Sequence, residues 1–184
     1  LEDLIQEMLD EDMKQASRDA HLKKHCSQSE IENIRQSLSV ISLLADVVER
    51  MVLDIERLGW EPTHIVGPES RGFIFGSMVA LQMGIGFIPV RKPGKLPHEI
   101  ERVEYSLEYG ENVLEIHKDA LTQDHRVVIV DDLLATGGTV SASAQLCQKI
   151  GASVSGGIFL IELDGLNGSA LAGIPTHSLL NYPA

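Results

Sequence analysis

The sequence predicts an α/β domain built on a mostly parallel sheet. Short apolar segments alternate with segments of about ten residues that show helical spacing, the pattern of strands joined by crossover helices. One apolar segment, Val127–Val130, contains no polar residue, as expected for a strand covered on both faces. The length of 184 residues suits one compact domain with a sizeable core.

The first third of the chain is expected to be helical. Apolar residues recur at helical spacing in Leu4–Met13 and again in Ile31–Ile41. Leu43–Leu58 is strongly amphipathic and is followed by a glycine, which predicts a helix that stops there. We therefore divide the chain into a helical N-terminal extension, residues 1–41, and a core domain, residues 42–184.

From residue 64 onward, strands and helices are expected in turn. The expected elements are strands at 64–66, 87–90, 126–130 and 154–163, helices at 73–83 and 140–150, and a hairpin at 104–116. Loops are expected at 92–102, which contains proline and glycine, and at 131–139, which is rich in small residues. Ligands of an open parallel sheet bind just beyond the carboxyl ends of strands, so the second loop is a candidate site.

The composition argues against several kinds of protein. The formal net charge is −12, from 15 basic and 27 acidic residues, so the chain has no overall attraction to nucleic acid. No apolar run approaches the roughly 20 residues that a transmembrane helix needs, and no secretory leader pattern is found. Cys26 and Cys147 form no C-x-x-C pair, which favours two reduced thiols in a cytoplasmic protein.

The strongest chemical signal is the run Val127–Thr139. A buried strand ends in two adjacent carboxylates, Asp131 and Asp132, and a loop of small residues then leads into a helix. Small residues let a ligand approach the backbone, and N–H groups at a helix start attract phosphate. We therefore expect a phosphate on the loop and a polyhydroxyl group on the carboxylates. The alternative is a tight turn with an acidic N-cap, which would leave paired acids at a buried strand end without a partner.

The glycine spacing of this run fits neither a Walker loop nor a dinucleotide fingerprint. The run resembles the phosphoribosyl pyrophosphate motif of type I phosphoribosyltransferases. The resemblance implies this family's fold, and it implies that Asp131 and Asp132 hold the ribose 2′ and 3′ hydroxyls. The residues that it assigns to the 5′-phosphate are Ala135, Thr136, Gly137, Gly138 and Thr139.

Two further segments resemble parts of this family that bind pyrophosphate. Gly67–Phe73 resembles the pyrophosphate loop, in which the final phenylalanine packs near the base, and Arg91–Pro97 resembles a basic segment that often reaches a neighbouring subunit's site. The residues that the resemblance assigns to pyrophosphate are Ser70, Arg71, Arg91, Lys92 and Lys95, with Phe73 at the base. The alternatives, taken without the resemblance, are that Arg71 is a surface ion-pair partner and that the basic segment is a solvated loop.

A fourth segment, Tyr105–Gly110 with Leu114–His117 after it, resembles the flexible hairpin that closes over the site in adenine-specific members of the family. The resemblance implies that Glu108 is an acid/base near the purine and that Arg71 is its catalytic partner at the leaving group. The implied reaction converts adenine and phosphoribosyl pyrophosphate into AMP and pyrophosphate. Without the resemblance, Glu108 is a strand residue that faces solvent.

The resemblance also implies a cofactor, a partner and a role. Mg²⁺ is expected, held mainly by substrate oxygens and water, so no dedicated protein cage is expected in the sequence. A homodimer is the family expectation, with the basic segment as the element that crosses between subunits. The implied role is purine salvage in the cytoplasm.

One feature of the adenine enzymes is missing from the sequence. Their purine is usually covered by a Phe-Pro-x-Pro-Gly segment, yet no proline precedes Pro62, and residues 27–34 read Ser-Gln-Ser-Glu-Ile-Glu-Asn-Ile. Three alternatives remain. The N-terminal helices form a different cover; the chain uses another purine base or has become a non-catalytic sensor of phosphoribosyl pyrophosphate; or this sequence omits or replaces native residues in that region. A sensor that regulates transcription would be expected to carry a basic DNA-binding domain, which this acidic chain lacks.

Overall fold

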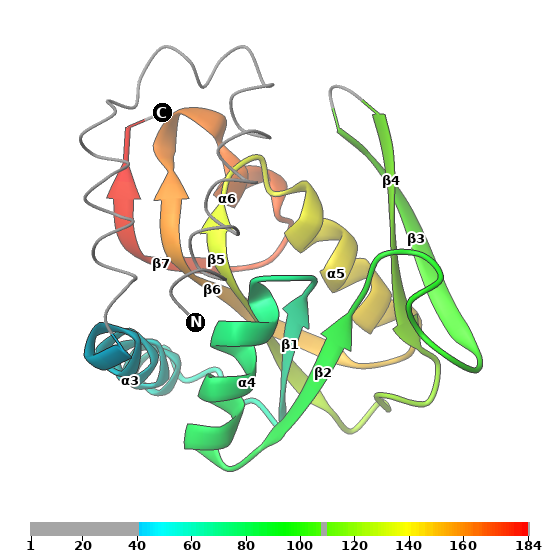
Figure 1. Ribbon diagram of the computed structural model, residues 1–184, viewed down its shortest axis with the longest axis horizontal. Helices are drawn as coiled ribbons and strands as arrows, with labels where there is room; N and C mark the ends of the chain where they lie inside the picture. Colours follow the sequence, from blue (N-terminus) through cyan, green and yellow to red (C-terminus); the bar gives the residue numbers. More distant parts are fainter. Residues whose placement is uncertain (1–40, 108–109, 184) are drawn as a thin grey trace.

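The computed structural model describes residues 41–107 and 110–183 (Figure 1). Except for Ile41, the predicted N-terminal extension at residues 1–41 lies outside this range, as do residues 27–34, where the purine cover was sought. Within the described residues, no helix is long and apolar enough to cross a membrane.

The centre of the fold is a five-stranded parallel sheet with the strand order β2-β1-β5-β6-β7. Its strands are β1 (His64–Pro68), β2 (Gly86–Val90), β5 (Arg126–Leu134), β6 (Ser153–Leu163) and β7 (Thr176–Tyr182). The predicted mostly parallel sheet is therefore confirmed. The edge strand β7 is not predicted from the sequence, because polar residues interrupt its apolar pattern.

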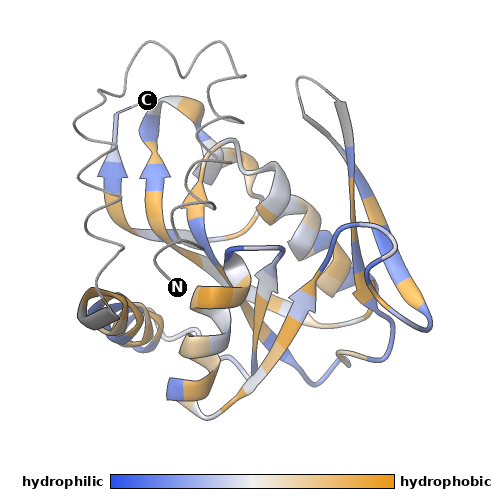
Figure 2. Cartoon of the chain, viewed as in Figure 1, coloured by the Kyte–Doolittle hydropathy of each residue, from blue (hydrophilic) through white to orange (hydrophobic). Residues whose placement is uncertain are grey.

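Helices cover both faces of this sheet. They are α3 (Ile41–Arg57), α4 (Gly72–Met83), α5 (Gly138–Lys149) and the short α6 (Gly168–Leu171), which follows the 3-10 turn η2 (Asp164–Leu166). Val128 and Val130 of β5 pack in one cluster with α3 and α4, whereas Val127 and Ile129 pack in a second cluster with α5. Successive strand residues point to opposite faces, so Val127–Val130 of β5 must be apolar at every position. Figure 2 shows apolar residues along the central strands and in α4.

A hairpin of β3 (Ile100–Leu107) and β4 (Gly110–His117) forms a separate antiparallel sheet. It stands beside α5 (Figure 1), and Val103 and Ile116 join the apolar cluster that contains α5. The predicted hairpin is confirmed, but it is longer than expected. Because Ile100 pairs with His117, the hairpin begins inside the predicted loop at 92–102, whose last three residues are strand.

The predicted end of β5 is wrong. The two acids were expected to begin the loop, yet β5 continues through Asp131 and Asp132 to Leu134. The neighbouring strand explains the difference, because β6 extends far enough to pair Leu133 with Ile161 and Leu134 with Glu162. Backbone pairing thus keeps the acidic residues in the strand, although their carboxylates break the apolar run on which the prediction depended.

Candidate functional site

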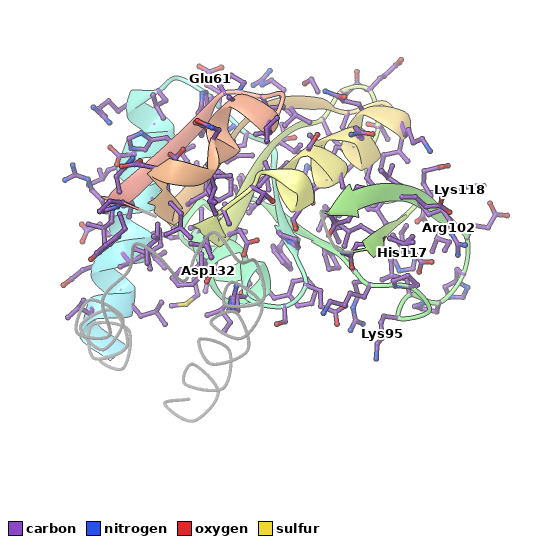
Figure 3. The ribbon with its side chains drawn as sticks, turned by 90° about the horizontal axis from the view of Figure 1, so that it is seen from above. Glu61, Lys95, Arg102, His117, Lys118 and Asp132 are labelled. Carbon is purple, nitrogen blue, oxygen red and sulfur yellow. The ribbon has the colours of Figure 1, made fainter. Side chains whose placement is uncertain are left out.

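The candidate site lies at the carboxyl ends of β1 and β5, which are neighbours in the sheet. Because the two strands are parallel, the loops that follow them leave the sheet at the same edge. Across this edge, Arg71 Nε lies 2.9 Å from Asp132 Oδ2, and the two side chains are only 14% and 9% exposed. Two predicted site residues from separate motifs therefore meet, and Figure 3 shows Asp132 within the body of the molecule.

The two adjacent acids have different surroundings. Asp131 Oδ1 accepts a hydrogen bond of 3.0 Å from the backbone N–H of Asp132. Burial raises the pKa of the Asp131 carboxyl well above its usual range, the Asp132 carboxylate raises it further, and the Arg71 guanidinium opposes both effects. Asp132 Oδ1 is buried and has no hydrogen-bond partner among the described residues. A buried carboxylate oxygen of this kind is suited to accept a hydrogen bond from a hydroxyl group of a ligand.

The predicted phosphate loop connects β5 to α5, and α5 begins with the residues named for it. Gly137 caps the helix with φ of +79°, a conformation that favours glycine. A Cβ at Gly137 would also collide with the carbonyl oxygen of Gly168 in α6. The loop is thus held close to α6, and the N–H groups of the first turn of α5 provide the expected setting for a phosphate.

The pyrophosphate loop follows β1 and leads directly into α4. Ser70 is exposed, and its carbonyl oxygen accepts a hydrogen bond of 3.1 Å from Phe73 N–H in the first turn of the helix. The Phe73 ring packs edge-on against the Phe87 ring, with centroids 6.0 Å apart. Phe73 therefore lies in the first turn of α4, and its ring contacts Phe87 of β2.

The basic segment is divided between the site and the surface. Arg91 Nε donates to Glu69 Oε2 at 3.1 Å, and the Arg91 guanidinium lies 5.9 Å from the Phe73 ring centroid, so Arg91 borders the pyrophosphate loop. Lys92 and Lys95 are exposed. In Figure 3, Lys95 points out from the molecule and away from Asp132. Within one chain, the structure therefore brings Arg91 to the site and directs the Lys95 side chain away from it.

The hairpin reaches the phosphate loop through a tyrosine. The Tyr105 hydroxyl lies 3.4 Å from the Thr139 hydroxyl, which joins β3 to the first turn of α5. The predicted acid/base, Glu108, lies outside the described residues. Sequence reasoning did not assign a role to Tyr105, although it stands within the hairpin segment that carries the resemblance.

Other residues of the site also went unassigned from the sequence. Glu69 accepts a hydrogen bond from Arg91 and lies within the pyrophosphate loop. Its position next to Ser70 in that loop could have identified it as a site residue. Gly168, which packs against the carbonyl of Ala135, lies far along the chain in a segment without any recognisable pattern. Only the folded arrangement reveals that contact.

The donor set of the site is compatible with magnesium. The carboxylates of Asp131 and Asp132 supply oxygen ligands, which Mg²⁺ prefers, and Asp132 Oδ1 has an unused lone pair within the described residues. The described residues contain no group of three or more His, Cys, Asp or Glu residues arranged to hold a metal ion. A magnesium ion at this edge would therefore take most of its ligands from substrate and water.

A parallel sheet that places a carboxylate pair, a helix N-terminus and an arginine-bearing loop at one edge defines a phosphoribosyltransferase of type I. The family model described as a phosphoribosyl transferase domain matches residues 27–162. An adenine phosphoribosyltransferase from Synechocystis is 54% identical over 136 residues, which cover 73% of this chain and 79% of the relative. Another from Francisella philomiragia is 51% identical over 150 residues, covering 78% and 86%.

Solved structures give the same result. An adenine phosphoribosyltransferase from Thermoanaerobacter pseudethanolicus is 48% identical with a TM-score of 0.76, covering 79% of this chain and 84% of that one. The Saccharomyces cerevisiae enzyme, in complex with an imino-altritol bisphosphate and adenine, is 39% identical with a TM-score of 0.75, covering 78% and 83%. The chain belongs to the phosphoribosyltransferase family and, within it, to the adenine phosphoribosyltransferases. The predicted family and fold are thereby confirmed.

Proposed function

We propose that this protein transfers the phosphoribosyl group of phosphoribosyl pyrophosphate to adenine, forming AMP and pyrophosphate in purine salvage. The observation that carries the proposal is the Arg71–Asp132 pair at the edge where the phosphate loop begins, in a chain of this family. The relatives named above are all adenine enzymes, which favours adenine over another purine base and over a non-catalytic sensor.

The residues at the sheet edge bind the sugar phosphate. Asp132 Oδ1 accepts a hydrogen bond from one ribose hydroxyl, and the neighbouring Asp131 accepts one from the second hydroxyl. The 5′-phosphate lies on Ala135–Thr139, where the N–H groups and dipole of α5 favour negative charge. Arg71, held at this edge by its ion pair with Asp132, offers the pyrophosphate a positive charge.

Bond breaking at C1 of the ribose releases pyrophosphate and leaves positive charge on the sugar. Arg71 and Arg91 stabilise the departing anion as charge that is already in place. Magnesium, when bound, supplies further positive charge to the pyrophosphate oxygens. A ring nitrogen of adenine bonds to C1, and Glu108 takes the proton that the purine releases, while the hairpin excludes water. Phe73 packs near the purine.

We further propose a homodimer. Helix α4 has no charged residue, Leu81 near its end is 82% exposed, and Ile74 and Met78 on the same side of the helix are partly exposed, so an apolar stripe remains on this helix. A second copy of the chain would cover it. A dimer would also give Lys95 a function, because its side chain points away from its own site (Figure 3) and can reach a partner's. Lys92 is an exposed residue of the same basic segment.

A cytoplasmic location is supported by the cysteine that the structure describes. Cys147 is a free thiol buried in the core of α5, and burial raises its pKa to about 12. Such a thiol stays protonated and unreactive, as suits a reducing compartment.

The experiment that tests the proposed reaction mixes the protein with magnesium and phosphoribosyl pyrophosphate, and offers adenine, hypoxanthine, guanine and xanthine in parallel. Pyrophosphate release should require adenine. A Glu108→Ala variant should be strongly impaired, and Glu104→Ala, which removes an exposed acid from the same hairpin, is the matched control. Turnover with a different base would overturn the specificity, and binding without turnover would indicate a sensor.

A further inference from the structure

Glu115 is a charged residue in an unexpected place. It belongs to β4, and the residue is completely buried. Acidic side chains are seldom fully buried, because the loss of hydration must be offset by close partners. Sequence reasoning assigned it no function. Because substrate cannot reach this buried carboxylate, its function depends on the protein groups to which it is hydrogen-bonded.

The backbone of Glu115 joins the hairpin to the central sheet. Arg91 N–H donates to Glu115 O, and Glu115 N–H donates to Arg91 O, each at 2.8 Å. Arg91 directly follows β2, so this isolated bridge connects the edge of the parallel sheet to β4 at the first residue of the basic segment.

The side chain of Glu115 holds the middle of the same segment. Glu115 Oε2 accepts a hydrogen bond of 2.9 Å from Gly94 N–H, in a turn where Gly94 has φ of +74°. Glu115 Oε1 accepts a hydrogen bond of 2.8 Å from Arg102 Nη2 on β3. Arg102 thus neutralises the buried charge, while the other oxygen fixes the turn.

The two ends of the segment are held as well. Arg91 Nη1 donates to Lys95 O at 3.1 Å, which closes the loop on itself. Glu69 Oε2 accepts hydrogen bonds from Arg91 Nε and Lys92 N–H, each at 3.1 Å. The backbone from residue 91 to residue 95 is therefore fixed between two carboxylates, and the exposed Lys95 side chain extends from it (Figure 3).

We propose that Glu115 is a positioning residue for pyrophosphate binding. It fixes the backbone turn from which Lys92 and Lys95 project, and it acts through that turn because its own carboxylate is sealed from solvent. The inference rests on the proposed function, including the homodimer through which the basic segment reaches the pyrophosphate site of the partner subunit. It identifies a residue outside the substrate contacts on which affinity for phosphoribosyl pyrophosphate depends. The competing explanation is that Glu115 only stabilises the hairpin.

The test compares Glu115→Ala with Val103→Ala. Val103 is a buried residue of the same hairpin and makes apolar contacts only, so its truncation destabilises the hairpin without altering the turn. Both variants are assayed well below their melting temperatures. In Glu115→Ala, the KM for phosphoribosyl pyrophosphate should rise about tenfold or more, while the KM for adenine changes by less than about twofold. In Val103→Ala, both KM values should stay close to wild type.

Two more variants sharpen the result. Glu115→Gln keeps an oxygen for Gly94 N–H but loses the charge that faces Arg102, so it should restore part of the affinity. Lys95→Ala should weaken affinity strongly in wild type and much less in Glu115→Ala, because the turn no longer presents the lysine. If Glu115→Ala does not fold, Glu115→Leu, which fills the buried space but offers no acceptor to Gly94 N–H, takes its place in both comparisons.

Equal KM changes in Glu115→Ala and Val103→Ala would overturn the inference, and so would additive effects of Lys95→Ala and Glu115→Ala. Failure of the proposed function has a different signature, namely a wild-type protein that does not turn over adenine. In that case, calorimetric titration with phosphoribosyl pyrophosphate and magnesium measures the affinities of Glu115→Ala and Val103→Ala directly. An unchanged affinity in Glu115→Ala would contradict the positioning role.

Discussion

Asp132→Asn removes one charge from the site and leaves the shape of the side chain almost unchanged. Asp132 is paired with Arg71 at 2.9 Å, and both side chains are largely buried. Removing one partner of a buried ion pair costs about 3–5 kcal/mol when the other charge is left uncompensated. Here Asp131 is a second carboxylate that interacts with the same arginine. We therefore expect a smaller loss, about 1–2 kcal/mol, or roughly 2–8 °C in melting temperature for a domain of this size.

The substitution should also change the titration of Asp131. Its pKa is raised by burial and further by the charge of Asp132, so the folded protein keeps this proton to higher pH than the unfolded chain does. Asp131 therefore makes its whole contribution to the free energy of unfolding at pH values below its unfolded pKa of 3.8. This contribution is lost as the pH rises through the folded pKa. Without the charge of Asp132, the pKa of Asp131 should fall, and the stability that Asp131 loses between low and neutral pH should become smaller. Carboxyl carbon NMR of labelled aspartate measures this directly.

Activity should fall more than stability. A hydrogen bond from a ribose hydroxyl to a charged acceptor contributes about 1.5–3 kcal/mol, which predicts a loss of about 10- to 150-fold in kcat/KM for phosphoribosyl pyrophosphate. Asp164→Asn makes the same change at an exposed position of η2 and is the control. A wild-type kcat/KM in Asp132→Asn would refute ribose binding at this carboxylate. A loss of stability above about 4 kcal/mol would refute compensation by Asp131.

Three further changes test separate parts of the fold. Tyr105→Phe removes the hydroxyl near Thr139, and the affinity for phosphoribosyl pyrophosphate should fall about 2- to 10-fold in initial-rate assays. Gly137→Ala forces a Cβ against the carbonyl of Gly168 at a positive φ, and calorimetry should show a stability loss of about 2 kcal/mol or more. Burial and His125 lower the pKa of His64, so wild type should lose stability as pH falls below 6.5, and His64→Gln should flatten this dependence in melting curves.

Each of these expectations has a clear opposite result. An unchanged affinity in Tyr105→Phe would mean that the hairpin contact does not serve the phosphate loop. An unaffected melting temperature in Gly137→Ala would mean that the loop and α6 are not held in close contact. A melting curve of His64→Gln that keeps the wild-type pH dependence would assign the acid sensitivity to other groups.

The sequence was most informative where the chemistry is contiguous. The strand, the acids and the small-residue loop of Val127–Thr139 follow one another along the chain, so their order alone predicted a phosphate site at the end of a parallel strand. The end of that strand was predicted too early, because an apolar run indicates which residues are buried and not which are paired. The strand itself continues as far as its backbone pairs with β6. Edge strand β7 was missed for a similar reason, since half-exposed positions carry no consistent pattern.

By itself, the sequence determined the alternation of strands and helices, the family resemblance and the residue types that carry charge to the site. These follow from neighbours along the chain, because local sterics and periodic burial act over a few residues. Only the tertiary structure decided that Arg71 meets Asp132, that Tyr105 reaches Thr139, and that Glu115 holds the turn at Gly94. Such contacts depend on strand order and on how side chains pack across layers, and no local pattern encodes either.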